Sequence, residues 1–173
     1  LARGDYVGIV DSSNILYKDS MNILRDYINK NNEIDFICGT VEKDSKIYAG
    51  FRPEDINRQF NIIPSSVVGF YIKLKSLKKV GLLNIKYKFQ SDYDLLYRMI
   101  VTHKLKGIRT KGNEIFGSLG DSGFSTKHGY FKSLFNELKI RFDNNQNLFL
   151  LIYIFFGRTF IKIYNYFLKW WEI

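Results

Sequence analysis

The sequence predicts an α/β fold with a mixed sheet, followed by a helical tail. Over the first 125 residues, short apolar runs typical of buried strands alternate with segments whose apolar residues recur at helical spacing. Only two prolines and an apolar share of 46% are typical of a globular chain and not of a disordered one. A length of 173 residues gives room for one domain, residues 1–125, and a tail, residues 126–173.

The expected strands are short runs rich in β-branched and aromatic residues. They cover residues 6–10, 34–39, 46–51, 67–72, 85–89 and 114–116, with residues 104–111 as a basic strand or loop. The expected helices cover residues 21–31, a short turn from 53 to 55, residues 74–80, and residues 92 to about 103. Asp19 or Ser20 can cap the first helix, and Gly81 ends the third.

The charge and the cysteine content limit the function classes. A formal charge of +9 predicts an anionic partner, such as nucleotide phosphates or anionic lipid, although solubility alone also explains it. The sequence has no helix-turn-helix pattern, RNP-type aromatic motif or zinc spacing, which argues against nucleic acid. The single cysteine, Cys38, lies in an apolar run, so we expect a buried side chain and a cytoplasmic protein.

Polar residues follow the first expected strand. Asp11, Ser13 and Asn14 come at its carboxyl end, which is where α/β folds place ligand contacts. An ordinary turn, capped by the same side chains, is the alternative interpretation.

Two carboxylates, Asp92 and Asp94, open the helical pattern that begins near residue 92. A carboxylate that projects from a helix start into a cleft can take a proton from a hydroxyl group. Ser91 and Asp94 have the spacing of a capping box, and Asp94 is four residues before Arg98, so an ion pair is expected. These structural roles account for Asp94 and leave Asp92 as the candidate base.

Residues 2–126 resemble the later part of the family 2 glycosyltransferases, which have the GT-A fold. Residues 4–17 resemble the strand that ends in the family's DxD-type metal motif, and residues 68–84 resemble the segment before its acidic motif. Residues 91–98 resemble the acidic motif itself, and residues 120–125 are a loose version of the glycine-rich turn that often follows.

The resemblance implies inverting transfer of a sugar from a nucleotide-sugar donor to a hydroxyl of a saccharide or lipid-linked acceptor, in polysaccharide or glycolipid synthesis. It makes Asp92 the catalytic base. The remaining residues carried over are Asp11, Ser13 and Asn14 on the donor and diphosphate side, and Asp94, Arg98, Gly120 and Gly123 as acceptor-side or structural residues.

Two departures from the family pattern affect these expectations. The family usually has acids where this chain has Ser13 and Asn14, so binding of Mg²⁺ or Mn²⁺ would rest on Asp11 and be weakened. The family's opening nucleotide-binding half has no counterpart before Leu1, so we expect the sequence to be the later part of a longer protein. A non-catalytic, glycosyltransferase-like protein that binds or scaffolds at a membrane surface is the alternative.

The tail has two helical segments. In the first, which is expected to begin near residue 125, the apolar residues on one side are Phe131, Leu134, Phe135, Leu138 and Phe142. After a polar break at residues 144–147, the nine apolar residues 148–156 are too few to span a bilayer.

The second segment continues with polar residues on one helix face, namely Arg158, Lys162, Asn165 and Lys169. A basic stripe, an apolar body and the terminal pair Trp170 and Trp171 favour a helix that lies in a membrane interface. We therefore expect residues 148–171 to bind the inner face of the membrane. A helix packed on protein and a tilted span are the alternatives.

Overall fold

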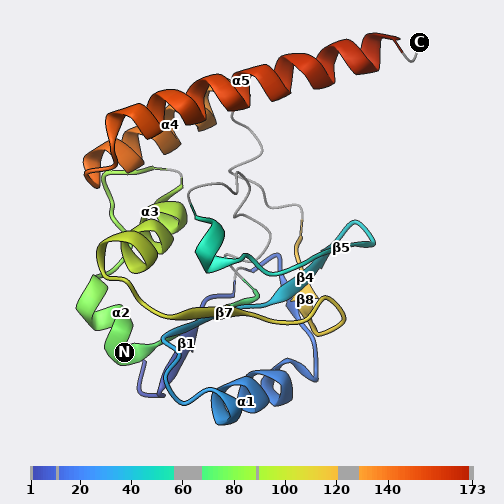
Figure 1. Ribbon diagram of the computed structural model, residues 1–173. Coiled ribbons are helices and arrows are strands. Elements are labelled where there is room, and N and C mark those ends of the chain that lie inside the picture. The colour runs from blue at the N-terminus through green and yellow to red at the C-terminus, as the bar shows by residue number, and fades with distance from the viewer. Residues whose placement is uncertain (1, 11, 57–67, 89, 121–128, 172–173) are drawn as a thin grey trace. The chain divides into compact units, whose positions relative to one another are not determined.

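The computed structural model describes residues 2–10, 12–56, 68–88, 90–120 and 129–171 (Figure 1). The chain divides into two compact units, Leu1–Ser125 and Thr126–Ile173. The first is a mixed α/β unit and the second is helical, so the expected α/β class is confirmed for the first unit.

One mixed sheet of the first unit contains, in the described residues, four strands in the order β1 (Tyr6–Gly8), β6 (Phe70–Lys73), β3 (Phe36–Cys38) and β7 (Gly107–Arg109). Strand β6 is antiparallel to both of its neighbours, whereas β3 and β7 are parallel. All three residues of β3 are buried, and β6 and β7 flank both edges of this strand.

A second mixed sheet has, within the same described ranges, the order β2 (Ile15–Leu16), β8 (Ile115–Ser118), β4 (Thr40–Lys43) and β5 (Lys46–Tyr48). The chain passes from β3 in the first sheet to β4 in the second through Gly39. A Cβ atom at Gly39 would lie 2.4 Å from the Phe116 ring, so only glycine allows this crossing. Strands β4 and β5 form a hairpin whose turn residues, Asp44 and Ser45, have positive φ angles of 48° and 58°.

Helices cover and connect these strands. The first unit has α1 (Ser20–Lys30), the 3₁₀ turn η1 (Pro53–Asp55), α2 (Leu74–Val80), α3 (Ser91–Tyr97) and a π-helical turn, η3 (Arg98–Thr102). Helix α1 contacts β8 and contributes Leu24 to a core cluster with Ile34, Ile37, Tyr71 and Phe116.

The strand expected at residues 85–89 is wrong for the residues that the structure describes. Asn84 organises a turn there, because its carbonyl accepts from the N–H of Tyr87 at 3.1 Å and its side chain accepts from the N–H of Lys86 at 3.0 Å. This is the local competition that asparagine offers to a strand.

The second unit contains α4 (Tyr130–Asp143) and α5 (Leu148–Trp171), which contact each other. Residues 144–147 form the expected break, and the Asn147 side chain accepts from the N–H of Phe149 at 2.8 Å at the start of α5. Helix α5 continues through Gly157 for 24 residues, so the short apolar run 148–156 is part of a longer helix.

Candidate functional site

Asp92 lies in the first turn of α3 and is partly exposed. One carboxylate oxygen accepts from the N–H of Tyr93 at 2.9 Å. Among the described residues this is the only hydrogen bond of that carboxylate, and no cation pairs with it. The other oxygen is therefore open to a hydroxyl group.

Asp94 has a different environment, although it is only two residues away. Its side chain is 1% exposed, and its Oδ2 accepts from Nε of Arg98 at 2.9 Å. The expected ion pair is confirmed. The expected capping box is wrong: α3 begins at Ser91, and the cap position is Gln90, whose φ is 64° and whose side chain makes no capping bond.

Arg98 extends this contact to α2. Its two terminal nitrogens donate to the carbonyl oxygens of Val80 at 2.6 Å and of Leu82 at 2.8 Å. A cation at the C-terminus of a helix satisfies carbonyls that have no partner within the helix and is favoured by the helix dipole. Arg98 therefore holds α3 on the end of α2, and the role of Asp94 and Arg98 is structural.

The turn after β1 packs against the segment after β8. The side-chain oxygen of Asn14 accepts from the N–H of Gly120 at 3.1 Å. A Cβ atom at Gly120 would lie 2.1 Å from the carbonyl oxygen of Ser13, so this close approach requires glycine. Asp11 and Gly123, which complete the predicted set, lie outside the described residues.

The predicted residues thus form two bonded groups. One contains Asp94 and Arg98 and adjoins Asp92, and the other contains Ser13, Asn14 and Gly120. Among the described residues, no hydrogen bond or ion pair joins Asp92 to Ser13 or Asn14.

A divalent metal does not fit the described part of the predicted donor side. Hard cations prefer anionic oxygens, whereas Ser13 offers a hydroxyl and Asn14 an amide oxygen that already accepts from Gly120. Over the described residues there is also no group of three or more His, Cys, Asp or Glu side chains that could hold a metal ion.

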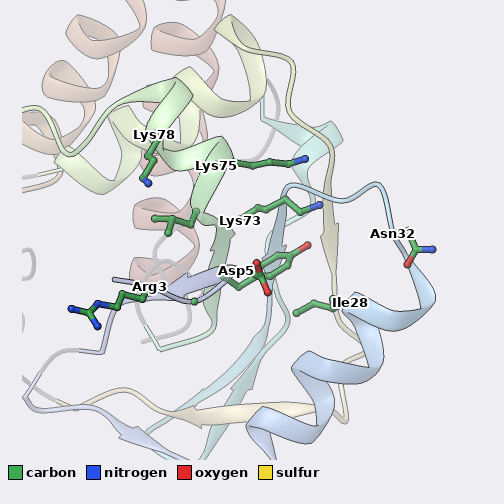
Figure 2. Close-up of a pocket in the computed structure, with 10 residues that line it drawn as sticks. Arg3, Asp5, Ile28, Asn32, Lys73, Lys75 and Lys78 are labelled. Atoms are coloured by element: carbon green, nitrogen blue, oxygen red, sulfur yellow. The ribbon is translucent and has the colours of Figure 1, made fainter. Parts of the chain in front are cut away.

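A basic pocket, which the sequence did not single out, lies at the start of β1 (Figure 2). Ser13 and Asn14 follow the other end of this strand in the chain. Its volume is about 510 Å³, and its lining comprises Arg3, Gly4, Asp5, Tyr6, Ile28, Asn32, Lys73, Leu74, Lys75 and Lys78. Four of these residues are cationic and one is acidic. Figure 2 shows Lys73 and Lys75 extending in the same direction. The signal in the sequence was the close spacing of Lys73, Lys75 and Lys78.

Tyr6 forms part of the wall of this pocket. Its hydroxyl donates to the carbonyl oxygen of Ile34 at 3.0 Å, and Nζ of Lys73 lies 5.8 Å from the centre of its ring. Burial, together with the negative charges of Asp35 and Asp5, raises the pKa of Tyr6. Tyr6 therefore stays neutral and supports Lys73 through a cation–π contact.

Cys38 is buried in β3, as expected. Burial strongly raises the pKa of its thiol. A thiol with a raised pKa is a poor nucleophile, so Cys38 belongs to the core.

No protein-family model matches the chain, and no curated protein matches it either.

Proposed function

We propose that this chain carries the catalytic base of an inverting glycosyltransferase. The observation that carries the proposal is the contrast between the two acids of α3. Asp94 is buried and bound to Arg98, whereas Asp92 presents an open carboxylate oxygen in the first helical turn. A rigidly anchored helix with one unpaired carboxylate at its start is suited to general base catalysis.

In this reaction Asp92 takes the proton from the acceptor hydroxyl. The hydroxyl oxygen attacks the anomeric carbon of the nucleotide sugar, and the bond from that carbon to the diphosphate oxygen breaks on the opposite face. The electron pair leaves with the nucleoside diphosphate. The acceptor is a saccharide or lipid-linked hydroxyl, and the donor contacts include Ser13 and Asn14.

The packing of the motif segments supports the proposal that this unit is part of a GT-A fold. Residues 68–84 are bonded to residues 91–98 through Arg98, and residues 12–14 are bonded to Gly120. These are the segments that resemble the family, and the mixed sheet is of the kind that the resemblance implies.

A transfer assay with a panel of uridine and guanosine diphosphate sugars tests the proposal. Asp92→Asn should abolish transfer without changing thermal stability, because within the described part of the chain the Asp92 side chain bonds only to the next residue. The matched variant Asp94→Asn should instead lower stability, since it breaks the buried pair with Arg98. Near-normal transfer by Asp92→Asn would exclude Asp92 as the base.

We also propose that α5 brings the enzyme to the inner face of the membrane, where a lipid-linked acceptor would lie. Residues Leu148–Leu168 form a helix that is long and apolar enough to cross a bilayer, and only 17% of its most apolar window is buried. Flotation with phospholipid vesicles tests this: removal of residues 145–173 should leave the protein at the bottom of the gradient. Equal flotation of both proteins would refute membrane attachment by the tail.

A non-catalytic binding or scaffolding function is the second candidate. It is favoured by the structural use of Asn14, whose side chain binds Gly120 where the family usually has an acid. Binding of saccharide by a protein that consumes no donor sugar would support this function over transfer.

A further inference from the structure

The helices α4 and α5 carry charged residues on the sides that face each other. Glu137 is 4% exposed and forms a two-pronged ion pair with Arg158, in which Nη2 of Arg158 lies 2.8 Å from Oε1 and Nη1 contacts Oε2. Nε of Arg141, which is fully buried, lies 3.2 Å from the same Oε1. One carboxylate is thus shared by two guanidinium groups between the helices.

Other polar groups follow the same seam. The Tyr130 hydroxyl donates to the carbonyl oxygen of Arg158 at 2.8 Å, and Nζ of Lys162 lies 5.2 Å from the centre of the Tyr130 ring. The polar stripe of α5 therefore meets α4 at Arg158, which pairs with Glu137, and at Lys162, which lies over the Tyr130 ring.

Large apolar side chains are exposed on both helices, away from the Glu137–Arg158 pair. On α4 the exposed rings are Phe131, Phe135 and Phe142, which repeat at intervals of four and seven residues and so share one face. This face adjoins α5 at one position, where the centre of the Phe135 ring lies 5.8 Å from that of Phe155. On α5 one row of exposed large side chains comprises Phe149, Ile152, Tyr153, Phe156, Phe160, Ile163, Tyr164 and Phe167, and Leu148, Ile161, Tyr166 and Leu168 are exposed on other faces. Phe149 is 83% exposed and Phe156 is 65% exposed.

This arrangement differs from a helical hairpin made for water: Leu134, Ile140, Leu151 and Ile154 are buried, but so is the charged cluster, while most of the large rings are exposed. In water, burial of large apolar side chains drives helix packing, and a continuous apolar surface of this extent marks an interface. In a bilayer, ionisable side chains face the inside of a helix bundle and pair with one another, while rings contact lipid. The distribution of charge and rings in α4 and α5 is that of the second environment.

We propose that α4 enters the phospholipid bilayer together with α5, as a hairpin that seals Glu137, Arg141 and Arg158 between its helices. The inference rests on the proposed membrane attachment by α5 and adds α4 and its aromatic face to the lipid-contacting surface. Helix α4 has 14 residues and is about 21 Å long, too short to cross a hydrocarbon core of about 30 Å. It lies in one leaflet, with the exposed Lys132 and Lys139 near anionic headgroups.

Depth-dependent fluorescence quenching on the full chain tests this inference. Single cysteines replace exposed residues of a Cys38→Ala chain, and each carries an environment-sensitive fluorophore. Vesicles of phosphatidylcholine and phosphatidylglycerol contain lipids with a nitroxide on the acyl chain. Labels at Phe131→Cys and Phe142→Cys on α4, and at Tyr153→Cys on α5, should be quenched. The matched label at Asp143→Cys, an exposed charged position of α4 outside the row of rings, should not.

The outcomes separate this inference from the proposed function. Quenching at Tyr153→Cys alone would show that α5 binds lipid and that α4 does not, which would overturn the hairpin and leave membrane attachment intact. If the chain formed a dimer in which all three apolar labels were unquenched and protected from water, the apolar faces would contact a second copy. That result would overturn both the membrane hairpin and the membrane attachment by α5. No outcome depends on sugar transfer, so the proposed role of Asp92 is tested separately.

A second, independent observation concerns the basic pocket. Arg3, Lys75 and Lys78 are exposed and have no ion-pair partner among the described residues. The lining holds four cationic side chains and one carboxylate, Asp5, and the nearby Asp35 accepts from Ser76 Oγ at 2.6 Å and from the N–H of Lys106 at 2.9 Å without pairing with a lysine of the lining. The positive charge of the pocket is therefore available to a ligand.

We infer that this pocket binds a phosphoryl group, either of a soluble phosphate ester or of a lipid headgroup. Titration calorimetry of the full chain with pyrophosphate should show binding that weakens at least tenfold in Lys75→Glu/Lys78→Glu and weakens with added salt. Lys79→Glu changes an exposed lysine of α2 outside the lining and should retain binding. An equal loss in both variants, or no binding of pyrophosphate or phosphatidylglycerol vesicles, would overturn the site. Competition between pyrophosphate and vesicles identifies the source.

Discussion

At the scale of single residues, Glu137 is a buried carboxylate in the second unit. It is the shared partner of two buried guanidinium groups. Removing one partner from a buried ion cluster leaves a charge without compensation, which typically costs about 3–5 kcal/mol. Glu137→Gln should therefore destabilise the helical unit by about that amount in denaturant unfolding followed by far-ultraviolet circular dichroism in detergent micelles.

The exposed pair on the same helix provides the control. Nζ of Lys139 lies 3.2 Å from the Asp143 carboxylate, and the Lys139 side chain is more than half exposed. Asp143→Asn should cost about 0.5 kcal/mol or less, because exposed ion pairs contribute little. Similar losses for the two variants would contradict the sealed cluster.

In the first unit, Arg98 is the charged residue that joins two helices through several hydrogen bonds. Its guanidinium group reaches one carboxylate and two carbonyl oxygens, a geometry that a lysine ammonium cannot reproduce. Arg98→Lys should lower the stability of the first unit by about 2–3 kcal/mol, through lost hydrogen bonds to a charged group and carbonyls left unpaired. Thermal unfolding by circular dichroism measures this. Arg109→Lys, at an exposed strand end, should be neutral.

The sequence predicted part of this residue-scale detail. The spacing of four residues between Asp94 and Arg98 was sufficient for the ion pair, because helix geometry fixes that neighbourhood. The carbonyls of Val80 and Leu82 could not be predicted, since they come from a different helix end. The capping box failed because Gln90 adopts a left-handed conformation before α3 and Asp94 is committed to Arg98.

At the scale of elements, Tyr27 joins α1 to the turn before β8. Its hydroxyl donates to Oε2 of Glu114 at 2.5 Å and accepts from the N–H of Lys111 at 3.1 Å. Desolvation alone would raise the pKa of Glu114, but hydrogen bonds from Tyr27 and from the N–H of Lys111 outweigh it, so the pKa is lowered.

A lowered carboxyl pKa gives a pH-dependent stability whose sign is defined. The folded state favours the ionised form of Glu114, so its contribution is present above the unfolded pKa and is lost as pH falls through the folded pKa. Glu114→Gln should flatten the decline in melting temperature below about pH 4.5, near the ordinary pKa of a glutamate. Glu54→Gln, in an exposed turn, should leave the profile unchanged, and a profile unaltered by Glu114→Gln would contradict the linkage.

Most elements followed from local signals. The apolar runs gave β1, β3, β5 and β8, and Gly81 marked the end of α2, where its φ is 90°. The split into two sheets was not predictable, because it depends on the close approach of Gly39 to Phe116, which are far apart in sequence.

At the scale of the whole molecule, the sequence predicted which residues share a helix face. It could not predict whether each face contacts protein, lipid or water. Helical periodicity placed Arg158 and Lys162 on one face of α5, and the structure retains that grouping. Which face meets a partner depends on the neighbouring helix. Glu137 and Tyr130 of α4 provide the partners, so Arg158 and Lys162 turn toward α4, while Phe149 and Phe156 remain exposed.

The outward rings of α5 predict an apolar, salt-insensitive membrane affinity. Burying a phenylalanine side chain contributes about 1.5–3 kcal/mol, which corresponds to a roughly tenfold or larger change in partitioning for each ring. Phe149→Gln and Phe156→Gln should therefore each weaken binding to neutral phosphatidylcholine vesicles at least tenfold in a sedimentation assay, at low and at high salt. Lys132→Gln should weaken binding only to anionic vesicles and only at low salt, because exposed charges are screened. If the phenylalanine variants bound neutral vesicles as tightly as the unaltered chain, these rings would not be the lipid-contacting surface.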